Sequence, residues 1–151
     1  MSVGIGYDSH RFAEGRALIL GGVEIEHQRG LSGHSDADVL THAVIDALLG
    51  AAGGGDIGTL FPDAEERWRD ADSIDMLSTV VGTIGGRILN IDATVVCEEP
   101  RLGPHRAEME RTLADITSAR VSVKATTNEG MGWIGRGEGI ACSAVALVEL
   151  D

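Results

Sequence analysis

The sequence is poor in cysteine, in aromatic residues and in positive charge. Among its 151 residues only Cys97 and Cys142 are cysteines, which is too few for a disulfide framework. Aromatic residues make up 3%, so a core has to be built from Val, Ile, Leu and Ala. Lysine and arginine number 12 against 24 acidic residues, which gives a formal net charge of −12. This balance disfavours nucleic acid and anionic membranes as partners.

Long apolar runs are also missing. No stretch approaches the roughly 20 residues of a membrane helix, and the charged residues Asp8, Arg11 and Glu14 do not fit a signal peptide. The two isolated thiols are typical of a reducing compartment, so we expect a cytoplasmic protein. The length suits a single domain over residues 1–151.

Glycine, in contrast, is abundant, with 21 residues, and predicts many tight turns. Apolar periodicity predicts the regular elements. Strands are expected at Ser2–Gly6, Ala17–Leu20, Val23–Glu26, Ile88–Val96, Val121–Thr126 and Ile140–Leu150, and helices at Asp36–Gly50, Ser73–Gly85 and Pro104–Thr117. This order predicts an α/β (α+β) fold with a single mixed β-sheet and helices on one face. The other face has no predicted cover, which favours oligomerisation.

Three polar residues form a candidate metal site. Asp8 and His10 follow the first predicted strand, and residues i and i+2 of an extended segment point to the same side. His42 lies on a predicted helix, with Asp38 and Asp46 four residues away on the same face. Either carboxylate is a candidate acceptor for the second ring N–H of a metal-bound imidazole. Such a set suits zinc with one open position, although each part also fits an ordinary polar surface.

Two further segments have the composition of phosphate or hydroxyl sites. Gly33–Asp36 precedes a predicted helix, and amides at a helix N-terminus bind phosphate, although Ser35 with Asp38 also fits a capping box. The glycines before Asp56 allow a ligand close to the backbone, with that carboxylate as an acceptor for hydroxyls. The long polar stretch Asp56–Asp72 is a candidate lid over a ligand, or else a solvated loop.

The segment after Lys124 combines hydroxyls with a carboxylate, and Glu129 is a candidate ligand for a hard cation such as Mg²⁺. A polar strand end explains the same pattern. Arg136 and Glu138 lie among glycines and are expected to contact phosphate or each other. The cysteines lack metal-type spacing and are interpreted as packed core thiols.

Together these residues resemble one family, the 2-C-methyl-D-erythritol 2,4-cyclodiphosphate synthases of the non-mevalonate isoprenoid pathway. The resemblance covers nearly the whole chain. The matching runs are Gly4–Phe12, Ser32–Leu40, Gly55–Asp63, Lys124–Thr127 and Gly135–Cys142.

The resemblance implies a metal-dependent phosphorus–oxygen lyase. It would convert 4-diphosphocytidyl-2-C-methyl-D-erythritol 2-phosphate to 2-C-methyl-D-erythritol 2,4-cyclodiphosphate and CMP. It further implies Zn²⁺ together with Mg²⁺ or Mn²⁺ as cofactors. The family forms homotrimers with active sites between subunits, which agrees with an uncovered sheet face.

Roles for individual residues also follow from the resemblance. Asp8, His10 and His42 match the zinc ligands, Glu129 matches a ligand of the second cation, and His34 and Thr127 match catalytic positions. The substrate-binding positions implied in this way are Asp8, His10, His34, Ser35, Asp56, Ile57, Gly58, Phe61, Pro62, Asp63, Ala64, Glu65, Pro100, Arg101, Leu102, Gly103, Thr126, Thr127, Asn128, Glu129, Trp133 and Arg136.

A few residues depart from the family pattern. Glu98 and Glu99 stand where smaller or neutral side chains are expected, and Gly103 replaces a bulkier apolar residue at the expected cytosine pocket. Arg69 replaces a lysine in the lid, and Trp133 replaces another large apolar group. Three other functions remain open: a non-catalytic, metal-dependent cytidine-nucleotide-binding module, a structural trimer, and a different metal hydrolase.

Overall fold

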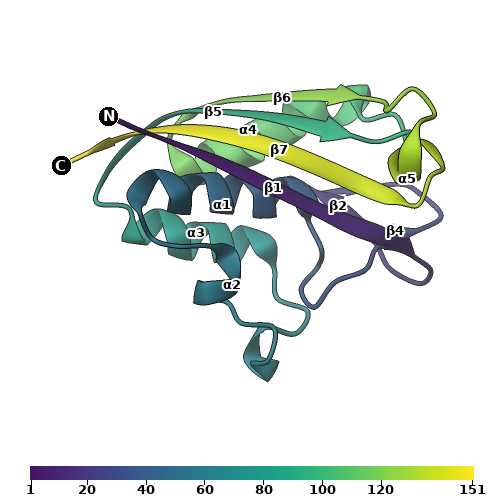
Figure 1. Ribbon diagram of the computed structural model, residues 1–151, viewed down its shortest axis with the longest axis horizontal. Coiled ribbons are helices and arrows are strands. Elements are labelled where there is room, and N and C mark those ends of the chain that lie inside the picture. The colour runs from purple at the N-terminus through teal and green to yellow at the C-terminus, as the bar shows by residue number, and fades with distance from the viewer.

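A mixed β-sheet of five strands, in the order β4-β1-β7-β5-β6, forms one layer of the molecule (Figure 1). The computed structural model describes residues 1–151. Strands β5 and β6 are parallel, and the other neighbouring pairs are antiparallel. The strands are β1 (Ser2–Ala13), β4 (Gly30–Leu31), β5 (Gly86–Val96), β6 (Arg120–Thr126) and β7 (Gly139–Leu150). The predicted combination of a mixed sheet with helices is confirmed.

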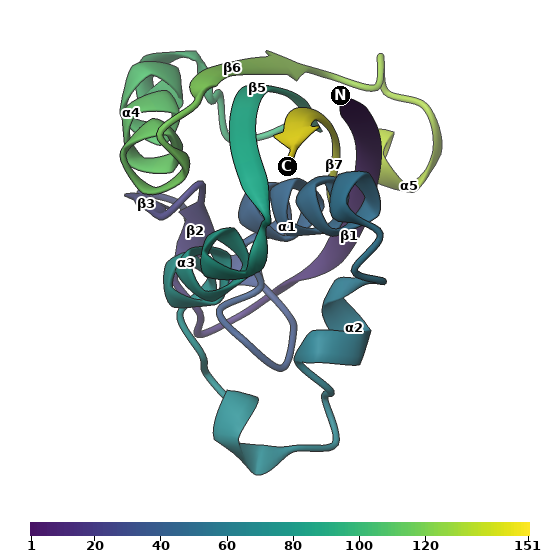
Figure 2. The same cartoon turned by 90° about the vertical axis from the view of Figure 1, so that its left-hand side faces the viewer.

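Helices pack on one side of this sheet. Figure 2 shows the sheet arching over α1, with α3 and α4 beside it. Eleven residues of α1 are buried, as expected of a helix that is apolar on most of its surface. The helices are α1 (Val39–Ala52), α2 (Ile57–Leu60), α3 (Ser73–Thr83), α4 (Arg106–Thr117) and α5 (Gly132–Gly135), with single 3₁₀ turns at Glu66–Trp68 and Gly103–His105.

Two glycines in β1 allow α1 to approach the strand unusually closely. A Cβ atom on Gly4 would lie 1.9 Å from the carbonyl oxygen of Ala47, and one on Gly6 would lie 1.9 Å from that of Ala43. No side chain fits in this space, so the backbones of the strand and the helix are in direct contact. The close approach brings together the polar side chains that follow on β1 and those at the start of α1.

The predicted hairpin forms, but it is not part of the main sheet, which corrects the prediction of a single sheet. Strands β2 (Leu18–Leu20) and β3 (Val23–Ile25) pair only with each other. The fully buried carboxylate of Asp38 ties their turn to α1 by accepting hydrogen bonds from the backbone N–H groups of Gly21 and Gly22, both at 2.8 Å.

Asp38 is also the N-cap of α1, where it accepts hydrogen bonds from the amide of Thr41 at 3.0 Å and from its hydroxyl at 2.7 Å. The predicted capping box that begins at Ser35 is therefore wrong. The helix begins at Val39, three residues later than the predicted start at Asp36, because the carboxylate of Asp38, and not the hydroxyl of Ser35, accepts from a free N–H group of the first turn.

Strand β1 is much longer than predicted, since it continues to Ala13. Asp8 and His10 therefore lie within the strand and not after it. Asp8 and His10 are polar because they face the site. The apolar pattern stops before them, and for this reason the sequence predicted that the strand ends at Gly6. The short β4, α2 and α5 were not predicted, since each is too brief to show periodicity.

The face of the sheet opposite the helices carries exposed apolar side chains. On β1, the side chains of Val3, Ile5 and Tyr7 are 66%, 74% and 57% exposed, and on β7 Val145 is 42% exposed. Val145 is the direct partner of Ile5 in the β1–β7 ladder, so these side chains form a continuous stripe. That a second copy of the chain covers this stripe stays a prediction. None of the helices has the length and apolar character needed to cross a bilayer.

Candidate functional site

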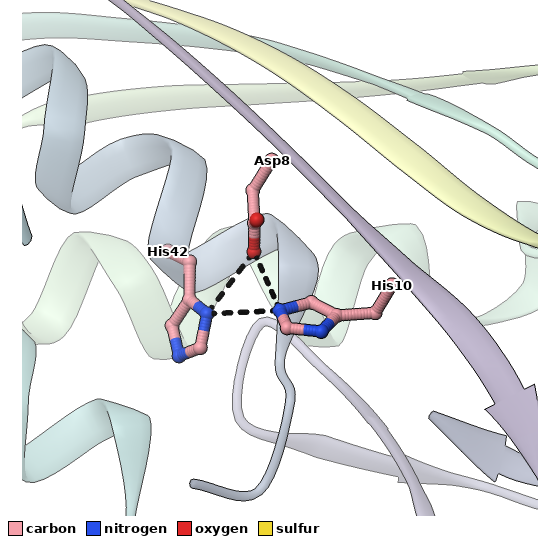
Figure 3. Close-up of side chains that lie close together, drawn as sticks. All are labelled: Asp8, His10 and His42. Carbon is pink, nitrogen blue, oxygen red and sulfur yellow. Dashed lines mark hydrogen bonds and ion pairs between the residues drawn. The ribbon is translucent and has the colours of Figure 1, made fainter. Parts of the chain in front are cut away.

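Asp8, His10 and His42 form one compact cluster where β1 meets α1 (Figure 3). The Oδ2 atom of Asp8 lies 2.9 Å from Nε2 of His10 and 3.1 Å from Nδ1 of His42. The two ring nitrogens lie 3.4 Å apart. Since Asp8 follows Gly6 by two residues, it faces α1 in the same way as the glycine does. The predicted juxtaposition of these three side chains is confirmed.

The charged forms of Asp8 and His10 are stabilised by their neighbours. Burial alone would raise the pKa of Asp8, but hydrogen bonds with His10 and His42 hold this pKa below its usual value. Burial alone would lower the pKa of His10, but its hydrogen bond with Asp8 raises this pKa. His10 Nδ1 also donates to the carbonyl oxygen of Ser32 at 2.7 Å, which turns Nε2 toward the cluster.

The cluster fits a divalent metal ion. One carboxylate oxygen and two imidazole nitrogens lie within 4.8 Å of one another, and three ligands of this type suit zinc with an open fourth position. A carbonyl or carboxylate acceptor on the second nitrogen of a ligating histidine is the usual supporting contact, and His10 has one in Ser32.

A cavity of about 230 Å³ opens beside the cluster. Its lining joins the metal-site residues to the phosphate segment and to the lid. The lining residues are Asp8, His10, Gly33, His34, Ser35, His42, Ile57, Gly58, Phe61, Asp63, Trp68 and Met76. The predicted substrate residues Pro62, Ala64 and Glu65 are not part of this lining, although they belong to the same loop.

His42 does not use either of the carboxylates predicted as its partners. Its Nε2 atom lies 2.8 Å from Oγ of Ser73 and 3.1 Å from Oγ of Ser35. Asp38 points toward the β2–β3 hairpin instead. Asp46 accepts a hydrogen bond from the amide of Ile57 at 2.8 Å and so holds the start of α2. Helical spacing correctly predicted that both carboxylates belong to α1 or its N-cap. It did not show which neighbouring segments would form hydrogen bonds with them.

The segment before α1 is joined to the end of the lid by its backbone. The amide of Asp36 donates to the carbonyl of Ala71 at 3.1 Å, and the amide of Asp70 donates to the carbonyl of His34 at 2.8 Å. The side-chain Nε2 of His34 lies 3.4 Å from the carbonyl oxygen of Glu65. These contacts place His34 at the junction of the cavity and the lid.

Within the lid, the rings of Phe61 and Trp68 meet edge to face, with centroids 4.8 Å apart. The indole Nε1 of Trp68 is buried without a hydrogen-bond partner.

Asp56 caps α2 by accepting hydrogen bonds from the side chain and amide of Thr59, and these bonds lower the pKa of Asp56. Asp56 is exposed and lies outside the cavity lining, so its predicted contact with substrate hydroxyls stays a prediction.

A second and larger cavity, of about 790 Å³, lies between the β5–α4 connection and the end of β6. This size is typical of small-molecule sites. Its walls include the predicted substrate residues Pro100, Arg101, Leu102, Gly103, Thr126 and Thr127. Cys97 is part of the same wall, and burial raises the pKa of its thiol to about 12. Burial raises the pKa of the Cys142 thiol as well. Both thiols are buried in the hydrophobic core, as predicted.

Glu98 supports the loop that follows β6. Its Oε1 atom accepts hydrogen bonds from the amide of Asn128 at 2.8 Å and from the amide of Gly130 at 3.2 Å. Between them, Glu129 has a left-handed backbone with φ of 53°, which is unfavourable for a residue with a side chain. The departure from the family pattern at Glu98 thus has a structural role that the sequence did not reveal.

Two further predicted residues lie outside both cavities. Arg136 Nε pairs with Glu138 Oε2 at 2.8 Å, which confirms the predicted contact between them. Trp133 lines a small cavity of about 220 Å³ together with His10 and Glu138. Neither residue lines the metal-site cavity or the larger cavity.

The metal-site cavity and the larger cavity have no lining residue in common. Within one chain, the predicted zinc ligands and the predicted catalytic residue Thr127 therefore belong to different pockets. The chain therefore has two separate cavities.

Known proteins resemble this chain over its full length. A family model described as the YgbB family matches residues 1–149. The 2-C-methyl-D-erythritol 2,4-cyclodiphosphate synthase of Syntrophomonas wolfei is 55% identical, over 99% of each chain.

Solved structures agree with this result. A bifunctional IspDF from Campylobacter jejuni has a TM-score of 0.92 and 43% identity, over 99% of this chain and 42% of that one. A 2C-methyl-D-erythritol-2,4-cyclodiphosphate synthase in a CDP-bound form has a TM-score of 0.87 and 37% identity, over 97% of this chain and 99% of that one. With a whole-length family match and a shared fold, the chain belongs to the YgbB family, the family of the 2-C-methyl-D-erythritol 2,4-cyclodiphosphate synthases.

Proposed function

We propose that the protein converts 4-diphosphocytidyl-2-C-methyl-D-erythritol 2-phosphate to 2-C-methyl-D-erythritol 2,4-cyclodiphosphate and CMP. The observation that carries this proposal is the cluster of Asp8, His10 and His42, beside His34 and Ser35 in one cavity. Relatives at about 55% identity bear this enzyme's name, which favours a synthase over a module that only binds a cytidine nucleotide.

The reaction needs no general base. The nucleophile is an oxygen of the 2-phosphate, whose second pKa of about 6 leaves it mostly ionised at neutral pH. This oxygen forms a bond to the β-phosphorus of the same molecule. The bond between the β-phosphorus and the bridging oxygen of CMP breaks, and CMP leaves with the electron pair. Two anionic groups must therefore be brought together and held in line.

Asp8, His10 and His42 would hold Zn²⁺, and Glu129 would hold Mg²⁺ or Mn²⁺. When bound, these cations supply positive charge that neutralises the approaching phosphates and the leaving group. His34 and Ser35 donate hydrogen bonds to phosphate oxygens, and Thr127 contacts the phosphate that is transferred. In a chain with a net charge of −12, such local positive charge is needed for an anionic substrate to bind.

The remaining residues hold the two ends of the substrate. Asp56, Ile57 and Gly58 at the start of α2 bind the methylerythritol hydroxyls, and residues 61–65 of the lid close over them. At the other end, Pro100–Gly103 form the cytosine pocket. Support comes from the positions of these segments, because Ile57, Gly58 and Phe61 line one cavity and Pro100–Gly103 line the other.

We further propose that the protein is a homotrimer in which each active site combines the metal-site cavity of one subunit with the larger cavity of the next. Two observations support this assembly. The two cavities share no lining residue within one chain, and the helix-free face of the sheet exposes Val3, Ile5, Tyr7 and Val145. The free thiols Cys97 and Cys142 fit the reducing environment of the cytoplasm.

Phosphorus NMR tests the reaction. Purified protein is mixed with the diphosphocytidyl substrate, with and without a zinc chelator. We expect the paired signals of a cyclic diphosphate together with CMP, and their loss on chelation. A His42→Ala variant should fold but lose zinc and most turnover. Binding without conversion would favour the nucleotide-binding module, and free orthophosphate would indicate a hydrolase.

A further inference from the structure

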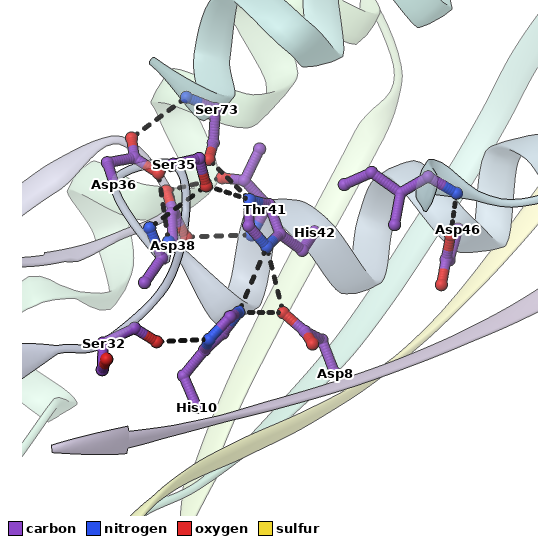
Figure 4. A network of polar contacts seen from close by, with 12 residues as sticks. Asp8, His10, Ser32, Ser35, Asp36, Asp38, Thr41, His42, Asp46 and Ser73 are labelled. Carbon is purple, nitrogen blue, oxygen red and sulfur yellow. Dashed lines mark hydrogen bonds and ion pairs between the residues drawn. The ribbon is translucent and has the colours of Figure 1, made fainter. Parts of the chain in front are cut away.

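Ser73 and Asp36 lie on the Nε2 side of the His42 ring, whereas Asp8 and His10 lie on its Nδ1 side (Figure 4). Ser73 is the first residue of α3 and is fully buried. Its hydroxyl lies 2.8 Å from Nε2 of His42 and also donates a short hydrogen bond to Oδ1 of Asp36. A chain of polar contacts therefore runs from Asp36 through Ser73 to the ring of His42.

The direction of each hydrogen bond in this chain follows from the groups involved. An ionised carboxylate can only accept hydrogen bonds. Oδ2 of Asp36 also accepts from the amide of Ser73 at 3.0 Å, so this carboxylate is fixed in place. Since the single hydroxyl proton of Ser73 is donated to Asp36, the Ser73 oxygen can only accept from His42. Nε2 of His42 must then carry a proton.

A metal ion takes the place of the hydrogen bond between Nδ1 and Asp8, and a proton on Nε2 then leaves the lone pair of the neutral imidazole on Nδ1. Nδ1 is the atom that faces Asp8 and His10, 3.1 Å and 3.4 Å from their nearest atoms. We propose that Ser73 and Asp36 are positioning residues of the metal site, which hold His42 in the tautomer and orientation that present Nδ1 to a metal ion. The inference rests on the proposed metal site but not on the reaction catalysed there.

The second hydroxyl near His42 has a different role in this arrangement. Oγ of Ser35 lies 3.1 Å from Nε2 and accepts a weak hydrogen bond from the amide of Ala37 at 3.3 Å. No carboxylate takes its proton, and Ser35 lines the cavity. The hydroxyl of Ser35 can therefore donate a hydrogen bond to a ligand, whereas the hydroxyl of Ser73 already donates to Asp36.

The same contacts also join the metal site to the lid. Ser73 follows the segment whose Ala71 carbonyl accepts from the amide of Asp36 at 3.1 Å. A purely structural role, holding α3 to the start of α1, is the competing explanation for both residues. If Ser73 positions His42, removing its hydroxyl should weaken zinc binding. If its role is only structural, the same change should lower fold stability and leave zinc affinity unchanged.

Zinc affinity is the direct test, measured by competition with a chelator and without substrate. Ser73→Ala and Asp36→Asn should each weaken zinc binding by about 10- to 100-fold, the usual effect of losing such a supporting contact. Ser78→Ala is the matched control, because Ser78 is an exposed serine on the same helix. It should bind zinc as the wild type does. Unfolding of the metal-free variants in urea gives the stability change separately.

A double-mutant cycle tests whether Asp36 acts through Ser73. If it does, adding Asp36→Asn to Ser73→Ala should change zinc affinity by at most about twofold, because coupled residues are not additive. The Nε2 proton of His42 in the zinc-loaded protein gives a spectroscopic signature. It should be protected from exchange in the wild type and exchange faster in Ser73→Ala.

Wild-type zinc affinity in Ser73→Ala, or fully additive effects in the double variant, would overturn the inference and leave the proposed function intact. If Ser73→Ala fails to fold, Asp36→Asn with an unchanged zinc affinity would have the same consequence. A wild-type protein that binds no zinc would overturn both proposals. A loss of stability with no change in zinc affinity would assign both residues a structural role alone.

Discussion

Gly6 lies on β1 two residues before Asp8, and its missing side chain leaves room for the carbonyl oxygen of Ala43 in α1. Gly6→Ala would place a methyl group 1.9 Å from that oxygen. The helix must then move away from the strand, at a cost of about 1–3 kcal/mol in unfolding free energy. Because Asp8 and His42 lie on the two separated elements, we also expect weaker zinc binding, measurable by chelator competition.

Gly82→Ala is the matched control for this substitution. Gly82 lies on α3 with no atom near the position of an added Cβ, and alanine favours a helix over glycine. This variant should be as stable as the wild type or more so, with unchanged zinc affinity. Wild-type zinc affinity in Gly6→Ala would show that the strand–helix distance does not control the metal site.

Glu98 is a second residue whose effect is local and measurable. Glu98→Ala removes the acceptor for the amides of Asn128 and Gly130. Their hydrogen exchange should accelerate by about tenfold or more, since a hydrogen bond to a charged group contributes roughly 1.5 kcal/mol. Glu98→Gln keeps one acceptor oxygen and should largely restore protection. Glu99 is an exposed neighbour, and Glu99→Ala should leave the exchange of these two amides unchanged. Equal exchange in all three variants would contradict the role of Glu98.

The sequence alone predicted the candidate metal ligands, but it did not predict the residues that contact those ligands from neighbouring elements. Asp8 and His10 are two residues apart in an extended segment, so sequence alone places them on one side. Ser73 is far from His42 in the sequence, and only the packing of α3 against α1 brings the two together. Helical spacing makes Asp38 or Asp46 a candidate partner of His42, but these carboxylates bind the β2–β3 hairpin and α2 instead.

At the scale of elements, α2 depends on one contact with α1. The four residues of α2 are too few to be stable alone, and Asp46 accepts a hydrogen bond from the amide of Ile57 at its start. Asp46→Ala should therefore free α2, speed hydrogen exchange at Ile57 and raise KM for the proposed substrate. Zinc affinity should change little, because Asp46 does not contact His42.

Asp46→Asn serves as the matched variant, since its amide oxygen can still accept from Ile57. It should resemble the wild type in both KM and exchange. A large loss of zinc affinity in Asp46→Ala with unchanged exchange at Ile57 would instead place Asp46 in support of the metal site, and would contradict the account given by the structure.

Long elements were predicted well because their periodicity extends over several turns or strand repeats. The end of β1 was missed, because Asp8 and His10 break the apolar alternation in order to face the site. The helices α2 and α5 were missed, since four residues carry too little pattern. At functional sites, local sequence rules and the actual structure are expected to disagree in this way.

At the scale of the whole molecule, the apolar stripe of Val3, Ile5, Tyr7 and Val145 is the basis for the proposed trimer. Ile5→Asp places a charge in the centre of this stripe, and burying an unpaired charge is costly. Analytical ultracentrifugation should then detect monomers, whereas we expect trimers for the wild type. The monomer should still bind zinc, whose ligands all belong to one chain, but it should not turn over substrate.

Thr79→Asp is a suitable control, because Thr79 is exposed on α3, among the helices, away from the apolar stripe. It should leave the trimer intact. A wild-type protein that sediments as a monomer and is fully active would refute the shared active site.

Subunit mixing tests whether two chains share one active site. In the proposed trimer, cyclisation takes place at a site made from the metal-site cavity of one chain and the larger cavity of another. His42→Ala disables the first half-site and Thr127→Ala the second, so each variant alone should be inactive. After the two are unfolded together and refolded, mixed trimers should contain some intact sites, and phosphorus NMR should detect the cyclic diphosphate and CMP. No product from the mixture, with wild type refolded in parallel regaining activity, would contradict the account.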